Sequence, residues 1–185
     1  MKLQGLKQIL TALTITCLTA TAQASEWKLD TASSKVGFLL QGLLPINAVF
    51  EKFEGKASYD PKNLKDIKIS FVAQADSLNA GLATYRLKDQ DNFNVDKFPK
   101  IEFSSSTATA DNATQGKITG NLTMRNVTKP VTMNITLDPA QSTDKLVVFK
   151  GTASVKRSDW GMTSNPDLAA DDVQLNVEGR LIPAP

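Results

Sequence analysis

The sequence has no histidine, a single cysteine and few aromatic residues. The absence of histidine excludes imidazole catalysis, zinc held by histidine and switching by histidine protonation. The lone Cys17 cannot form a disulfide within the chain. Its 21 basic and 19 acidic side chains nearly balance, so no strong charge marks the chain as a binder of nucleic acid. No apolar run reaches the length of about 20 residues that a membrane-spanning helix needs.

The first 24 residues have the pattern of a secretory signal peptide. Two lysines precede an uncharged, largely apolar run over residues 9–20, and Ala22-Gln23-Ala24 is a small-residue cleavage pattern. We therefore expect export, cleavage near Ala24, and one mature domain over residues 25–185 without a permanent membrane span. Removal of the signal would leave 161 residues with 19 basic and 19 acidic side chains.

Beyond this segment the dominant pattern is an alternation of apolar and polar residues, which is typical of half-buried β-strands. The clearest example runs from Val131 to Leu137. The pattern predicts about eight strands, near residues 36–40, 53–59, 67–75, 101–109, 118–124, 131–137, 146–155 and 173–177. Because most are short and separated by turn-forming residues, an antiparallel sandwich or barrel is expected.

Residues 76–99 break the alternation, and we call them the lid segment. Residues 80–90 within it are predicted to form one or two helical turns. A long insertion between short-loop strands is usually either functional or disordered. Because Tyr85, Phe93 and Phe98 argue against disorder, we expect the segment to cover one end of the β-structure.

The apolar faces of the strands mix large residues with small ones such as Gly55, Ala57 and Gly120. An eight-stranded barrel has an interior that side chains can just fill, or that holds one small ligand where some are short. Small residues also relieve crowding where strands bend, so the pattern leaves a filled core open as well. The expected wall of a cavity is apolar and consists of Phe38, Phe53, Phe71, Ala73, Ala75, Phe103, Leu122, Met124, Met133 and Val155.

Residues in and near the lid segment are the candidates for contacts at the mouth of such a cavity. Tyr85 joins an apolar body to a polar tip, and Arg86 has an apolar stem below its charge. The expected set at the mouth or lid is Tyr85, Arg86, Asp91, Phe93, Phe98, Trp160 and Met162. A packed aromatic plug at one barrel end is the alternative role of Trp160 and Met162.

No arrangement of residues points to catalysis or to a metal site. Ser104-Ser105-Ser106 has no histidine to activate it, and no pair of carboxylates stands out. The acidic residues between Asp89 and Asp96 are spaced superficially like a calcium loop, but the required glycine and glutamate are missing. We therefore predict that the protein is not an enzyme and has no cofactor or metal.

Several segments together resemble the YceI-like family of polyisoprenoid-binding, lipocalin-like periplasmic proteins. The strongest are KFPKIEFSS at residues 97–105 and GNLTMRNVTKPV at residues 120–131. Supporting segments are WKLD at 27–30, FEKFEG at 50–55 and RSDWGM at 157–162. The resemblance covers essentially the whole expected mature chain in order.

The lid segment departs from the family pattern. The family usually has a histidine-arginine-aspartate stretch that ends in His-Leu-Arg, whereas residues 85–93 read YRLKDQDNF and contain no histidine. Arg86, Lys88 and Asp91 retain part of the charged character. This departure affects the expected preference for a lipid head group and does not change the expected fold.

The resemblance implies an eight-stranded antiparallel, lipocalin-like barrel with a long apolar pocket that holds a polyisoprenoid such as a quinone or a prenyl carrier. It also implies a periplasmic location and often a homodimer. The expected function is therefore a binding or carrier protein for a long apolar isoprenoid lipid, with no nucleic-acid partner. Two alternatives stay open: a filled barrel that serves as an envelope interaction or stress-response module, and an enzyme that acts on a prenyl-linked substrate.

Overall fold

The structure is a computed structural model that describes residues 25–60 and 63–185. The expected signal peptide, with its cleavage site at Ala24, lies outside the described residues. The side chains of residues 59–66 are also outside the description. In the described part of the chain, no helix is both long and apolar enough to cross a bilayer.

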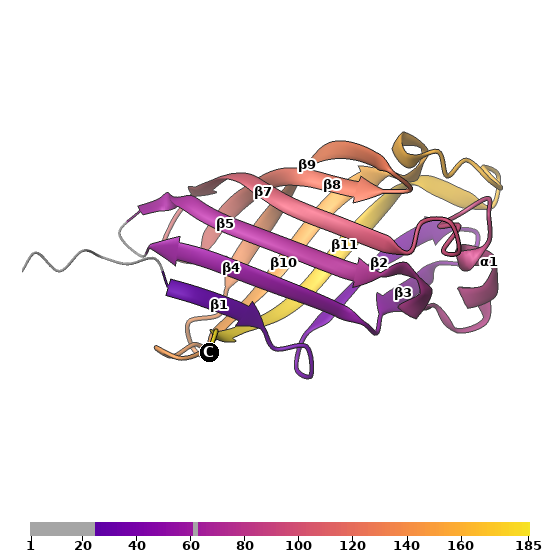
Figure 1. Cartoon of the computed structure of the whole chain (residues 1–185). Coiled ribbons are helices and arrows are strands. Elements are labelled where there is room, and N and C mark those ends of the chain that lie inside the picture. The colour runs from indigo at the N-terminus through magenta and orange to yellow at the C-terminus, as the bar shows by residue number, and fades with distance from the viewer. Residues whose placement is uncertain (1–24, 61–62) are drawn as a thin grey trace, which may run out of the picture.

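Within the described residues, eight antiparallel strands close into a barrel (Figure 1). The ring consists of β1 (Ser25–Leu29), β4 (Phe53–Asp60), β5 (Asn63–Gln74), β7 (Lys100–Ala110), β8 (Gln115–Met124), β9 (Val127–Leu137), β10 (Val147–Lys156) and β11 (Ala169–Pro183). Each strand pairs with the next one named, and β11 pairs with β1. This confirms the predicted eight-stranded antiparallel barrel and resolves the choice between a barrel and a sandwich.

Three further strands, β2 (Lys35–Gly42), β3 (Ile46–Phe50) and β6 (Leu78–Asn79), extend the wall at one end of the barrel. The long β11 pairs with β2 near its start and with β1 near its end, so both strands lie along the same side of β11. The alternation pattern located β2 but not β1, β3 or β6. Each of these has five residues or fewer, which is too short for a clear alternation.

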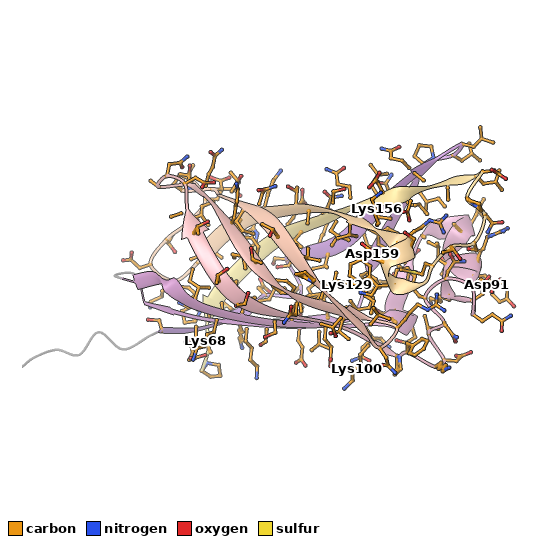
Figure 2. All side chains as sticks on the ribbon, turned by 90° about the horizontal axis from the view of Figure 1, so that it is seen from above. Lys68, Asp91, Lys100, Lys129, Lys156 and Asp159 are labelled. Carbon is orange, nitrogen blue, oxygen red and sulfur yellow. The ribbon has the colours of Figure 1, made fainter. Side chains whose placement is uncertain are left out.

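Strand alternation separates an apolar interior from a polar outer face. In β2, the buried Val36, Phe38 and Leu40 alternate with more exposed neighbours. Figure 2 shows the side chains of Lys68 and Lys100 pointing away from the barrel. A shift of one residue in the pairing would turn every inner side chain outward, so the apolar pattern fixes the register of the strands.

The lid segment covers the barrel end at which β5 finishes and β7 begins. It contains β6, a 3₁₀ turn at Gly81–Ala83 and the short helix α1 (Thr84–Lys88), and a further 3₁₀ turn at Ala75–Ser77 leads into it. The predicted short helical turns are therefore confirmed. Phe93 is buried, and its ring centroid lies 5.7 Å from that of Phe38 and 6.1 Å from that of Phe50.

The connection between β10 and β11 closes the same end. It begins with a 3₁₀ turn at Arg157–Trp160, in which Trp160 is 2% exposed and donates its indole N–H to the carbonyl oxygen of Leu122 at 3.4 Å. Arg125 donates to the carbonyl oxygens of Gly161 at 2.8 Å and Gln90 at 3.3 Å. Hydrogen bonds from one side chain thus join this connection to the lid segment.

Ser158 in this connection binds Asp171, near the start of β11. Its hydroxyl donates to Asp171 Oδ2 at 2.7 Å, and its backbone N–H donates to Oδ1 at 2.9 Å. These two hydrogen bonds, the hydroxyl's first, lower the pKa of Asp171 below its ordinary value, with smaller help from the charges of Lys156 and Arg157. Because the pKa is lower in the folded protein, the ionised carboxylate stabilises the fold at pH values above the unfolded pKa of about 3.9.

We expect Asp171→Asn to reduce the loss of stability on acidification. In the wild-type protein, the contribution of Asp171 is lost as the pH falls below about 3.9 through the lowered folded pKa. Urea unfolding between about pH 5 and pH 3 measures this loss, which should be smaller in Asp171→Asn than in the wild type. Asp172→Asn removes the same charge one residue later and should keep the wild-type profile. Identical pH profiles for all three proteins would contradict the assignment.

Candidate ligand-binding cavity

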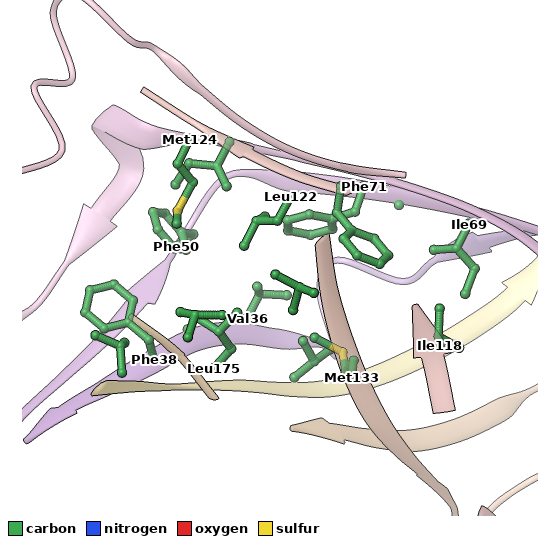
Figure 3. A pocket seen from close by; sticks show the side chains of 18 of the residues that line it. Val36, Phe38, Phe50, Ile69, Phe71, Ile118, Leu122, Met124, Met133 and Leu175 are labelled. Atoms are coloured by element: carbon green, nitrogen blue, oxygen red, sulfur yellow. The ribbon is translucent and has the colours of Figure 1, made fainter. Parts of the chain in front are cut away.

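An apolar cavity of about 190 Å³ runs along the interior of the barrel. The strands of the closed ring contribute to its wall together with β2, β3 and the lid segment. Figure 3 shows Phe38, Phe50 and Met124 toward one end and Ile69 and Ile118 toward the other. Cavities of about 150 Å³ with leucine, isoleucine and phenylalanine walls stay dry and bind benzene. A void of this size and lining therefore favours an apolar guest over water.

The free space is distributed unevenly along the barrel. At the lid end, the wall residues Phe38, Phe50 and Phe93 are buried. Toward the opposite end, wall residues such as Ile118 and Phe149 keep more exposed surface. The lid end is therefore the more closely packed one, and we call the less closely packed end, where β11 finishes, the wider end.

Seven of the ten predicted wall residues line the cavity, namely Phe38, Phe71, Phe103, Leu122, Met124, Met133 and Val155. The other three do not line it. Phe53 packs against Phe71 with ring centroids 6.1 Å apart. Ala73 and Ala75 are 0% and 1% exposed, because the lid end around them is filled by protein atoms. Contact of any of these ten residues with a ligand stays a prediction.

The predicted mouth residues fall into two groups. Phe93 and Met162 line the cavity, and Trp160 is buried in the structure that closes the lid end. Tyr85 and Asp91 are exposed, Arg86 is exposed and donates to Asn165 Oδ1, and Phe98 is half-buried outside the cavity, near the Lys97 and Arg125 side chains. These four side chains do not line the cavity.

Many of the residues that line the cavity were not predicted from the sequence. Unpredicted lining residues at the wider end include Leu29, Ile69, Ile118, Ile135, Phe149 and Leu181. Ile69, Ile118 and Ile135 lie on the inner face of strands that the alternation located, so that same signal was sufficient to find them. Asn92 and Arg157 also line the cavity, and an apolar pattern cannot reveal polar lining residues.

Both polar atoms of the Asn92 side chain have hydrogen-bond partners at the lid end. Its amide nitrogen donates to the Arg86 carbonyl oxygen at 3.0 Å and to Asp89 Oδ1 at 3.1 Å. Its amide oxygen accepts the hydroxyl of Ser164 at 3.1 Å. Asn92 therefore positions the lid segment against the β10–β11 connection.

The cavity wall is suited to binding by burial. Among the described residues that line it, there is no carboxylate, thiol or imidazole. The described part of the chain also contains no group of three or more histidine, cysteine, aspartate or glutamate residues that could hold a metal ion. The wall thus offers apolar contact, and its charged residues are the exposed Lys56 and the buried Arg157.

Comparison with known families matches the YceI-like domain to residues 27–181. The chain is 31% identical over 173 residues to Protein YceI of Salmonella arizonae, and the alignment covers 87% of this chain and 90% of that protein. The same values hold for Protein YceI of Salmonella paratyphi B.

Solved structures share the fold. BcnA of Burkholderia cenocepacia superposes with a TM-score of 0.76 at 22% identity, covering 82% of this chain and 98% of BcnA. A polyisoprenoid binding domain from Saccharophagus degradans superposes with a TM-score of 0.67 at 9% identity, covering 85% of this chain and 98% of that domain. The family match and the similarity to Protein YceI show that the chain belongs to the YceI-like family.

Proposed function

We propose that this protein is a non-enzymatic carrier or sequestering protein that binds a long apolar isoprenoid, a polyprenyl or quinone-type lipid, inside its barrel. The observation that carries the proposal is the apolar cavity of about 190 Å³ within the closed ring of strands. Burial of a methylene group contributes about 0.8 kcal/mol, so a five-carbon isoprene unit contributes roughly 3 to 4 kcal/mol. The polyisoprenoid binding domain from Saccharophagus degradans, which shares the fold, supports this ligand class.

The cavity can adapt to a chain longer than the void itself. Met124, Met133 and Met162 line it, and methionine side chains change shape readily because they are unbranched and flexible. The wider end also gives the rest of a long chain a direction in which to extend. The open interior favours a carrier over an interaction module, because the module was expected to have a filled barrel.

The proposal includes export to the periplasm after removal of residues 1–24. It includes no nucleic-acid partner, no cofactor and no metal, and the bound lipid is a ligand rather than a reactant. Formation of a homodimer is not required for ligand binding, because the cavity lies within one chain.

Native mass spectrometry of protein purified from its own host tests the function. We expect a bound species that extracts into organic solvent and fragments as an isoprenoid, and we expect the protein in the periplasmic fraction. Ligand-free protein whose tryptophan fluorescence does not respond to an added isoprenoid quinone would contradict the proposal.

Ala57→Leu should lower the affinity for a long isoprenoid while the barrel remains folded. Ala57 lines the cavity, so the larger side chain occupies ligand space. The same substitution at Ala73, which is 0% exposed and does not line the cavity, should instead destabilise the fold by about 1–3 kcal/mol through overpacking. Titration with an isoprenoid quinone and urea unfolding measure the two effects. If the wild type and Ala57→Leu bound the isoprenoid quinone with equal affinity, the ligand would not occupy the cavity beside Ala57.

Glycines in the wall keep aromatic rings out of the barrel centre. A Cβ atom at Gly179 would lie 2.2 Å from the ring of Phe149, its partner across the strand pair. At Gly120 it would lie 2.5 Å from the ring of Phe103. Each ring therefore occupies space that a methyl group at the glycine would take.

Gly179→Ala should reduce the room for a long chain. The new methyl group displaces the Phe149 ring, and the inner side of the wall has the space to receive it. Affinity for a long isoprenoid quinone is expected to fall more than affinity for a quinone with a single isoprene unit. Circular dichroism checks that the variant is folded. An unchanged ratio of the two affinities would show that the ring does not limit the cavity.

A further inference from the structure

Arg157 places a buried cation at the lid end of the cavity. It is the first residue of the 3₁₀ turn that follows β10, it is 7% exposed, and it lines the cavity. Burial of an ion is costly unless the ion is paired and hydrogen-bonded. The hydrogen-bond acceptors and charged groups around this guanidinium therefore show which partners the protein itself does not supply.

The protein satisfies only part of the hydrogen-bonding capacity of Arg157. Nε donates to the carbonyl oxygen of Ala170 at 3.0 Å, Nη1 to that of Met162 at 3.0 Å and Nη2 to that of Ala169 at 3.2 Å. A guanidinium has five N–H donors. One N–H on each terminal nitrogen is therefore left over from these bonds.

The charge of Arg157 has no close anionic partner among the side chains that the structure describes. Asp171 acts on it at longer range, and the carboxylate of Asp171 is already held by Ser158. The polar neighbour Asn92 has its own partners. Arg157 lines the cavity, and the two N–H groups left over on its guanidinium can donate to an oxygen anion that reaches them.

We propose that Arg157 binds the terminal oxygen anion of an apolar chain, a carboxylate or a phosphate, so that the head group lies at the lid end and the chain runs toward the wider end. This inference rests on the proposed function, because it adds the head group and the orientation to a chain held by burial. It predicts that an isoprenoid acid binds more tightly than the alcohol or hydrocarbon with the same chain.

The two tryptophans of the sequence report on orientation. Trp160 lies in the same 3₁₀ turn as Arg157, at the lid end. Trp27 lies on β1 opposite Pro183, the last residue of β11, at the other end. The indole N–H of Trp27 is buried without a partner among the described groups, but Trp27 does not line the cavity.

The first experiment compares geranylgeranoic acid, geranylgeraniol and the corresponding hydrocarbon by fluorescence titration at neutral pH. The acid is expected to bind about tenfold more tightly than the alcohol, because a charge-assisted hydrogen bond is gained. Arg157→Met should abolish this ratio, and Arg157→Lys should retain part of it. Arg125→Met is the matched control, because Arg125 also holds carbonyl oxygens of the lid end but does not line the cavity.

The second experiment uses the Trp27→Phe protein, in which Trp160 is the remaining tryptophan. A fatty acid with a nitroxide near its carboxyl group should quench Trp160 more strongly than one with a nitroxide near its methyl end. The reciprocal Trp160→Phe protein should show the opposite order through Trp27. This measurement needs no change at Arg157 and therefore does not depend on the folding of the Arg157 variants.

The outcomes separate the two proposals. Failure of all three geranylgeranyl chains to bind would contradict the proposed function and this inference with it. Equal binding of acid, alcohol and hydrocarbon, or stronger quenching of Trp160 by the methyl-end label, would contradict the role of Arg157 alone. An acid preference that survives in Arg157→Met would also contradict it.

Discussion

The pairing of β11 with β1 is the constraint on which the rest of the structure depends. It closes the sheet, so that the apolar faces of eight strands converge on one interior without a free edge in the ring. An eight-stranded ring encloses a volume that side chains can nearly fill. Gly120 beside Phe103 and Gly179 beside Phe149 have no side chains to fill part of that volume. The unfilled part of the interior is the cavity.

The two ends of the barrel differ in physical character. At one end, the Phe38, Phe50 and Phe93 rings pack together, and the covering segments are joined by hydrogen bonds that Arg125 donates and by one that Asn92 accepts from Ser164. At the other end, the wall residues are less buried. The cavity runs between these two ends, and the proposed contact of Arg157 with an anionic head group would favour one of the two directions in which a chain can lie.

The alternation predicted an antiparallel sandwich or barrel because alternation over long strands is a strong signal, as from Val131 to Leu137 in β9, and the family resemblance selected the barrel. It missed β1, β3 and β6, which are too short to alternate clearly. It located inner faces but not the empty space between them, since Ala73 and Phe71 share a face of β5 and only Phe71 lines the cavity. Tyr85 is exposed and Arg157 is buried because of how segments that are far apart in the sequence pack together. A local pattern of apolar and polar residues carries no information about that packing.

The interior of the barrel is the proposed binding site for an apolar chain. The most direct measurement is the electron density inside the barrel, in crystals of protein purified from its own host without lipid-stripping detergent. We expect one continuous, elongated feature along the barrel from the lid end toward Ile118 and Phe149. An interior without such density, in which the Met133 and Phe149 side chains have moved inward to fill the space, would contradict it.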